Sequence, residues 1–196
     1  MFRTLIPCLI FFLFISCIRD ENGIPVGSQL LSNTDFSVSE NNVSPWSSVA
    51  PAGFRAGIST EEFQTGTRSV FIESTDSLSS NSGTWRQTYR GAMPAPGRRL
   101  RLQAFIKGEN IISNGSVSNV FISIRAFPVE DSSGITRNRF ASTQNRILVN
   151  GTFDWEPIEI VLPSFPEEVE ELTVFLVMSG KTFGKVYFDN VTLSVE

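Results

Sequence analysis

The chain has 196 residues, and its 16 lysine and arginine residues against 20 aspartate and glutamate residues give a net charge of -4. It contains no histidine, which excludes Ser-His-Asp and Cys-His catalysis and histidine-bound zinc. The acidic balance, with no long basic run, argues against a nucleic acid or an anionic membrane surface as the partner.

Residues 1–16 predict a bacterial signal peptide. The apolar run from Leu5 to Ile15 is shorter than the about 20 apolar residues that a membrane-spanning helix needs. The run ends at a small residue before Cys17 and resembles a lipobox, with Phe14 where the common lipobox has leucine. We therefore expect cleavage before Cys17 and a lipid on its thiol. The alternative is an ordinary cleaved signal whose terminal cysteine carries no lipid.

Residues 17–28 predict a lipidated tether, because they are polar and interrupted by glycine and proline. A lipid anchor would place the protein at the bacterial outer membrane or cell surface, with the membrane contacted through the anchor only. Both cysteines, Cys8 and Cys17, precede the body of the chain, so we expect no disulfide and no cysteine metal site in residues 29–196.

Residues 29–196 predict one all-β domain. In residues 100–107 apolar and polar side chains alternate, which is typical of a half-buried antiparallel strand, whereas residues 172–178 are apolar throughout and favour a central strand with both faces covered. Further strands are expected at 69–74, 84–89, 120–127, 146–149, 157–162 and 184–196. About eight or nine antiparallel strands in one domain indicate a two-sheet antiparallel β-sandwich of the jelly-roll type.

The closing segment "GKVYFDNVTLSVE" places an acid among apolar residues. Strict alternation puts Asp189 on the same face as Tyr187, Val191 and Leu193. An ionised carboxylate buried without a partner costs many kcal/mol, so Asp189 should be hydrogen-bonded, displaced by a bulge, or bound to a cation.

Several phrases in order along the chain resemble the galactose-binding-like jelly roll. They are "LLSNTDF", "TGTRSVFIES", "TWRQTY", "PAPGRRLRLQAFIKG", "NGTFDWEPIEIVLP" and "GKVYFDNVTLSVE". Together they are similar to the xylan- and glucan-binding carbohydrate-binding modules that accompany glycoside hydrolases, and they cover nearly all of residues 29–196. The resemblance implies a sandwich that binds a glycan, and it leaves the ligand itself open.

The resemblance also implies a structural calcium that joins the first and last strands. Asp189 matches the closing acid of this family, and an acid near the "NTDF" turn would complete the site. Ser37 stands where the family often has glutamate, so Asp35 would have to take that place. The alternative is that Asp189 accepts backbone N–H groups at a bulge, without an ion.

Sugar binding needs aromatic faces with polar groups nearby, and seven residues are candidates for this role. They are Trp46, Trp85, Arg86, Gln87, Tyr89, Arg125 and Phe127. Alternation places Trp85, Gln87 and Tyr89 on one face of their strand, opposite Arg86, Thr88 and Arg90; the alternative is that this trio belongs to the core.

The other candidates come from a loop and from a second strand. Trp46 lies in a proline-containing loop and is expected at an exposed tip, while Arg125 and Phe127 could line a concave sheet or form an ordinary solvated face. Trp155 is expected to be structural. The glutamate run at 167–171 is interpreted as a solvated loop rather than a catalytic pair of carboxylates.

Three functions follow from these features. The first is a non-catalytic, lipid-anchored envelope protein that captures a glycan through a face of the sandwich. The second is a structural or adhesive surface lipoprotein that binds a protein partner. The third is an enzyme with carboxylate or Tyr/Arg chemistry, which we do not expect, since only "TWRQTYRG" brings tyrosine and arginine close together.

Overall fold

The computed structural model describes residues 23–114 and 119–196. The predicted signal peptide, Cys17 and the first half of the predicted tether lie outside the described residues. The described part of the chain forms ten strands, and it contains no helix that is long and apolar enough to cross a membrane. The strands are β1 (Ser47–Val49), β2 (Phe54–Ser59), β3 (Ser69–Ser74), β4 (Gly83–Tyr89), β5 (Leu100–Ser113), β6 (Val120–Phe127), β7 (Phe140–Ser142), β8 (Gly151–Leu162), β9 (Glu171–Met178) and β10 (Thr182–Val195).

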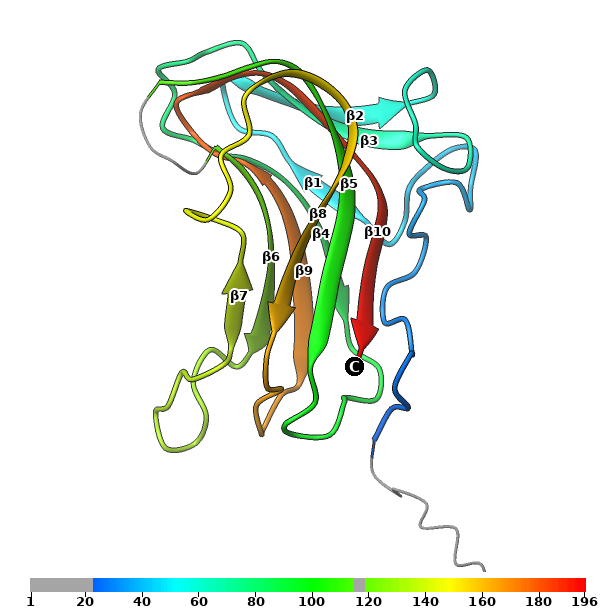
Figure 1. The fold of residues 1–196 in the computed structure, drawn as a ribbon, viewed down its shortest axis with the longest axis vertical. Coiled ribbons are helices and arrows are strands. Elements are labelled where there is room, and N and C mark those ends of the chain that lie inside the picture. Colours follow the sequence, from blue (N-terminus) through cyan, green and yellow to red (C-terminus); the bar gives the residue numbers. More distant parts are fainter. Residues whose placement is uncertain (1–22, 115–118) are drawn as a thin grey trace, which may run out of the picture.

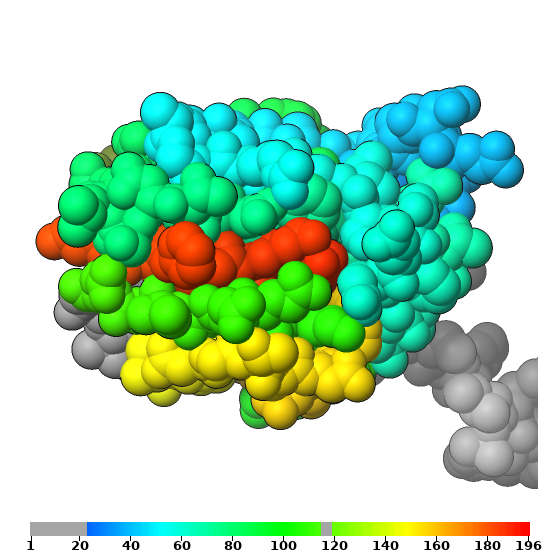
Figure 2. All heavy atoms as spheres, turned by 90° about the horizontal axis from the view of Figure 1, so that it is seen from above, coloured from blue at the N-terminus to red at the C-terminus, as the bar shows by residue number. Residues whose placement is uncertain are grey.

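The strands form two five-stranded sheets whose neighbours are all antiparallel. Sheet I has the order β1-β4-β9-β6-β7, and sheet II has the order β2-β3-β10-β5-β8 (Figure 1). Figure 2 shows part of the outer surface of sheet II from above, where β10 (red) lies beside β5 (green). The predicted fold class, a two-sheet antiparallel sandwich of the jelly-roll type, is therefore confirmed.

The core lies between the sheets, because each strand turns one row of apolar side chains inward. Sheet II contributes fully buried residues such as Ile72 and Phe188, and sheet I contributes residues such as Ile122 and Leu176. The last strand also holds the start of the described chain: Gly27 N–H donates to Val195 O at 2.8 Å, and residue 29 forms a bridge with residue 194. The end of the predicted tether is thus already joined to the sandwich.

Most of the expected strands are present, and one is wrong. Residues 69–74 and 120–127 form strands with the predicted bounds. Residues 146–149 follow a turn that is closed by Arg146 N–H to Thr143 O at 3.0 Å, and they form no strand. The Val149 N–H donates to the side-chain oxygen of Asn119, so a side chain replaces the partner strand that the apolar run suggested.

A bulge in β10 explains the acid in the closing segment. Asp189 pairs with Phe105, but the next paired residue, Thr192, faces Gln103, so β10 carries one more residue than β5 over this step. Asn190 has a φ of 47°, which allows the strand to turn here. Before the bulge the inward side chains are those of Val186 and Phe188. After it they are those of Val191, Leu193 and Val195, so the bulge changes the inward positions from even to odd residue numbers. The strict alternation assumed from the sequence is therefore wrong across this step.

Candidate functional site

The outer face of sheet I is hollowed by a groove of about 460 Å³. We call it the groove throughout. Its lining residues are Pro45, Ser47, Arg86, Thr88, Arg90, Phe127, Glu171, Thr173 and Phe175. Most of these residues come from β4, β9, the end of β6 and the start of β1, and Pro45 and Arg90 lie just outside β1 and β4, so a sheet forms the floor.

Cross-strand pairing sets the groove residues in rows. Arg86 on β4 lies opposite Phe175 on β9, and one row further Thr88 lies opposite Thr173, with their hydroxyl oxygens 2.9 Å apart. In the third row Arg90 forms an ion pair with Glu171 at 2.7 Å. The rows place aromatic, hydroxyl and guanidinium groups side by side on one surface.

Aromatic rings border the floor of the groove on the β6 side. Phe127 and Phe175 are partly exposed, and Phe140 of the neighbouring β7 is 50% exposed. The Arg125 guanidinium carbon lies 6.0 Å from the centre of the Phe127 ring and 5.4 Å from that of Phe140. Partly exposed rings beside hydrogen-bond donors provide what a sugar needs: apolar contact for the ring faces and partners for the hydroxyls.

The structure places the predicted trio of β4 on the opposite side from the groove. Trp85 and Gln87 do share a face, but it is the inward face, and they are only 5% and 3% exposed. Trp85 Nε1 donates to Phe71 O at 3.0 Å, and Gln87 pairs with both backbone groups of Ser32, at 2.8 and 2.9 Å. The core interpretation therefore describes both residues, whose side chains cannot reach a ligand in the groove.

Tyr89 and Trp46 also differ from the binding prediction. Tyr89 packs against the core and donates its hydroxyl to Ala92 O at 2.8 Å. Trp46 was expected at an exposed loop tip, which is wrong: it is 5% exposed, its ring centre lies 5.3 Å from that of Phe36, and its Nε1 donates to Asn33 O at 3.0 Å. The loop at Trp46 folds inward because this large ring gains more by burial than by exposure.

Of the seven candidates, Arg86, Arg125 and Phe127 lie at the groove. Arg86 and Phe127 line it, and Arg125 stands beside Phe127 on the same face of β6. Sequence reasoning gave no ligand role to Thr88, Arg90 and Phe175. The alternation in "TWRQTY" did contain the signal for β4, since it set Arg86, Thr88 and Arg90 opposite Trp85. For β9, residues 172–178 were expected to be covered on both faces, but Phe175 is partly exposed in the groove.

Asp189 is the one acid of the described residues whose side chain is fully buried. It is 0% exposed and lies under the loop between β2 and β3, where its Oδ2 accepts the backbone N–H groups of Gln64 at 2.7 Å and Thr65 at 2.8 Å. Its Oδ1 accepts the N–H of Asn190 at 2.7 Å. The carboxylate thus joins the bulge of the last strand to a loop more than one hundred residues earlier in the chain. These bonds are those that the bulge interpretation of Asp189 requires.

Burial dominates the electrostatics of this acid. Loss of solvation raises the pKa of Asp189 from 3.8 to about 6, while the hydrogen bonds from Thr65, Asn190 and Gln64 oppose the rise and the charge of Asp35 adds to it. Two buried oxygens of the residues that donate to Asp189, Gln64 Oε1 and Thr65 Oγ1, have no hydrogen-bond partner among the described residues. Among the described residues, no group of three or more His, Cys, Asp and Glu could hold a metal.

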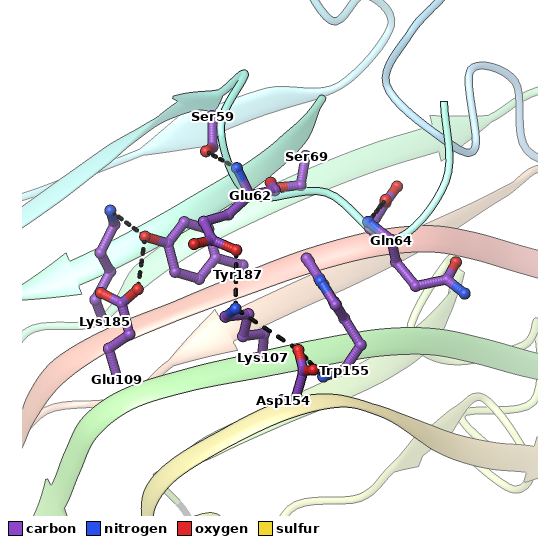
Figure 3. Close-up of polar contacts among 11 residues, drawn as sticks. Ser59, Glu62, Gln64, Ser69, Lys107, Glu109, Asp154, Trp155, Lys185 and Tyr187 are labelled. Carbon is purple, nitrogen blue, oxygen red and sulfur yellow. Dashed lines mark hydrogen bonds and ion pairs between the residues drawn. The ribbon is translucent and has the colours of Figure 1, made fainter. Parts of the chain in front are cut away.

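The outer face of sheet II carries charged and aromatic residues that pair with one another. Figure 3 shows Lys107 from β5 with Glu62 and Asp154 around it, at 2.8 and 3.6 Å. On the same face Tyr187 donates to Glu109 Oε1 at 3.1 Å, and the centre of its phenol ring lies 6.4 Å from that of Trp155. Trp155 is therefore packed at this face, far from the groove on sheet I.

Comparisons with known proteins identify the fold. No protein-family model matches the chain, and no curated protein matches it in sequence. A CBM22-1 xylan-binding domain from Paenibacillus barcinonensis Xyn10C has a similar structure, with a TM-score of 0.55 and 12% identity over 88% of this chain and 97% of that chain. The Stig cyclase Fisc from Fischerella sp. TAU has a TM-score of 0.62 and 15% identity, over 87% of this chain and 98% of that one.

The chain spans only part of another similar structure. The enzymatically active domain of tailspike protein 4 from bacteriophage CBA120 matches 86% of this chain but 21% of its own, with 15% identity and a TM-score of 0.59. At such identities the likeness concerns the fold, which is the jelly-roll β-sandwich of carbohydrate-binding modules and of domains with other functions.

The raised pKa of Asp189 predicts a pH-dependent stability. The folded state binds the proton of Asp189 more tightly than the unfolded chain does, so protonation of Asp189 stabilises the folded state. This contribution is complete below about pH 4 and is lost as pH rises through about 6. The neutral side chain of Asp189→Asn cannot titrate. In thermal melts from pH 4 to pH 8 in chelator, the melting temperature of the parent minus that of the variant should fall by a few degrees as pH rises. A difference that grows with pH contradicts the assignment.

Proposed function

We propose that this protein is a non-catalytic binding module that captures a glycan in the groove of sheet I. The observation that carries the proposal is the joint presence, on one hollowed sheet face, of partly exposed rings and hydrogen-bonding side chains. Phe175 and Phe127 supply apolar contact, while Thr88 and Arg86 supply partners for hydroxyl groups. The xylan-binding domain among the similar structures supports this use of the fold.

A binding role without catalysis agrees with the number and the pairing of carboxylates in the groove. Glycoside hydrolysis generally uses two carboxyl groups that face each other across the bond to be broken. The lining residues of the groove include one carboxylate, Glu171, and this is held by Arg90 at 2.7 Å. Glu171 is therefore suited to fixing the position of Arg90 rather than to proton transfer.

The groove is tested by removing one ring. The full chain, purified in mild detergent, is first screened on a glycan array, and the best-binding glycan is then titrated against the variants. Loss of one stacking ring should cost about 1 kcal/mol or more, so Phe175→Ala should bind about fivefold more weakly. The matched control is Trp155→Ala, which removes a ring from the outer face of sheet II. Unchanged binding by Phe175→Ala, with weaker binding by Trp155→Ala, would move the site to sheet II.

The proposal includes a lipid anchor on Cys17, which would hold the protein at the bacterial outer membrane or cell surface. The support is the apolar run that ends in "FISC" and the polar segment that follows. Cells that express the protein and are fed a fatty-acid analogue should label the parent but not Cys17→Ala. Label on the variant, or none on the parent, is the result that would remove the anchor.

A structural calcium near Asp189 remains part of the proposal. Since the described residues hold no group of three acids that could bind a metal, backbone carbonyls and water would have to supply most of its ligands. The charge of Asp35 is close enough to affect Asp189, and Thr65 Oγ1 is a buried oxygen without a hydrogen-bond partner among the described residues. Calcium takes oxygen ligands of these types, with backbone carbonyls completing the set. A bound cation would offset the repulsion between the two carboxylates.

Thermal melts separate calcium from a bulge without an ion. Excess calcium over chelator should raise the melting temperature of the parent, since a ligand at a hundredfold excess over its Kd stabilises the folded state by about 2.7 kcal/mol. The shift should be lost in Asp189→Asn. If millimolar calcium does not change the melting temperature of the parent, the protein binds no calcium at this site and the backbone N–H groups alone stabilise Asp189. A shift that persists in the variant would place the ion elsewhere.

A further inference from the structure

Building on the proposed glycan-binding function, we infer that the ligand of the groove is an acidic polysaccharide, whose carboxylate or sulfate groups bind Arg86 and Arg125. Two arginines, Arg86 and Arg90, line the groove with one acid, Glu171, and a third arginine, Arg125, stands beside it. The groove therefore carries a local positive charge on a chain whose net charge is -4.

Two of the three guanidinium groups are available to a ligand. Arg86 is exposed, and its guanidinium group makes no hydrogen bond or ion pair with any described residue. Arg125 is also exposed, and its contacts within the described chain are with the Phe127 and Phe140 rings, which hold it without neutralising its charge. Arg90 differs, because Glu171 neutralises it at 2.7 Å.

The outer face of sheet II pairs more of its cations with acids. Arg55 pairs with Glu73, and Lys107 has Glu62 at 2.8 Å. Arg101 on the same sheet contacts two carboxylates, of Glu159 at 3.0 Å and Glu196 at 2.6 Å. Lys185 differs, because it contacts the Tyr187 hydroxyl and the Phe71 ring. Carboxylates thus neutralise three cations of sheet II, whereas at the groove they neutralise one arginine of three.

The positions of the two arginines suit charges that are spread along a polymer. Arg86 lies on β4 opposite Phe175 of β9, and Arg125 lies on β6 opposite Thr173 of β9, so their backbones are about 12 Å apart across and along the sheet. Phe175 lies on the intervening strand, opposite Arg86. This spacing permits a sugar to contact the ring while acidic groups on that sugar or its neighbours reach the guanidinium groups. Arginine is the side chain that best matches planar and tetrahedral oxyanions, through paired hydrogen bonds.

The test compares polymers that differ only in charge. The full chain in mild detergent is titrated with glucuronoxylan and with polygalacturonate, each beside its carboxyl-reduced form, and with a sulfated galactan beside its desulfated form. We expect at least one acidic polymer to bind about tenfold more tightly than its neutral counterpart at low salt, since charge-assisted hydrogen bonds are stronger than neutral ones. The pairs also tell a carboxylate ligand from a sulfate ligand.

Variants locate the effect in the groove. Arg86→Gln and Arg125→Gln should each weaken binding of the preferred acidic polymer by about tenfold, and should weaken binding of the neutral form much less, because glutamine keeps a hydrogen-bonding group for sugar hydroxyls. Arg86→Lys, which keeps the charge and loses the paired hydrogen bonds, should fall between parent and Arg86→Gln. Arg55→Gln, on the opposite face, is the matched control and should bind as the parent does.

The outcomes separate this inference from the function on which it rests. Equal binding of an acidic polymer and its neutral counterpart overturns the inference and leaves glycan binding intact. An absence of binding to every polysaccharide, acidic or neutral, overturns the proposed function as well. Single-stranded DNA that binds more tightly than any acidic polysaccharide, and loses this binding in Arg86→Gln, overturns the inference by making nucleic acid the partner.

Discussion

Each strand of the sandwich can bury one row of its side chains and must leave the other row outside, and this constraint decides which residues reach a ligand. On β4 the buried row contains Trp85 and Gln87, so the row that remains for binding is Arg86, Thr88 and Arg90. The same constraint on β9 puts Leu172, Val174 and Leu176 in the core and turns Thr173 and Phe175 to the groove. The core and the groove are two sides of the same strands, and the groove obtains its chemistry from residues that the core does not use.

The alternation of inward and outward side chains is interrupted once in β10, at the buried carboxylate of Asp189. The bulge at Asp189 and Asn190 shifts the inward row by one residue, and the carboxylate accepts the N–H groups of Gln64 and Thr65 instead of water. Three backbone hydrogen bonds partly offset the loss of solvation that raises its pKa to about 6. The acid thereby fixes the loop between β2 and β3 to the last strand, on the side of the molecule away from the groove.

The fold and part of the site could be predicted from the sequence. The alternating residues of β5 and the apolar run of β9 were sufficient to predict a sandwich, and the sharing of a face by Trp85 and Gln87 followed from period two alone. Which face is buried does not follow from period two. Both rows of "TWRQTY" contain polar residues, and the Gln87 side chain is buried because the backbone of Ser32, 55 residues away, satisfies its amide. The prediction that Trp46 is exposed was wrong for a related reason, since its partners Phe36 and Asn33 come from a separate loop.

The central claim, that the groove of sheet I is the binding surface, is tested most directly by hydroxyl-radical footprinting of the full chain with and without the bound polysaccharide. The account predicts that oxidation of Phe127, Phe140 and Phe175 falls on binding, because the polymer covers the rings beside Arg86 and Arg125. Oxidation of Trp155, on the outer face of sheet II, should not change. Protection of Trp155 with unchanged oxidation of the three phenylalanines would contradict the account.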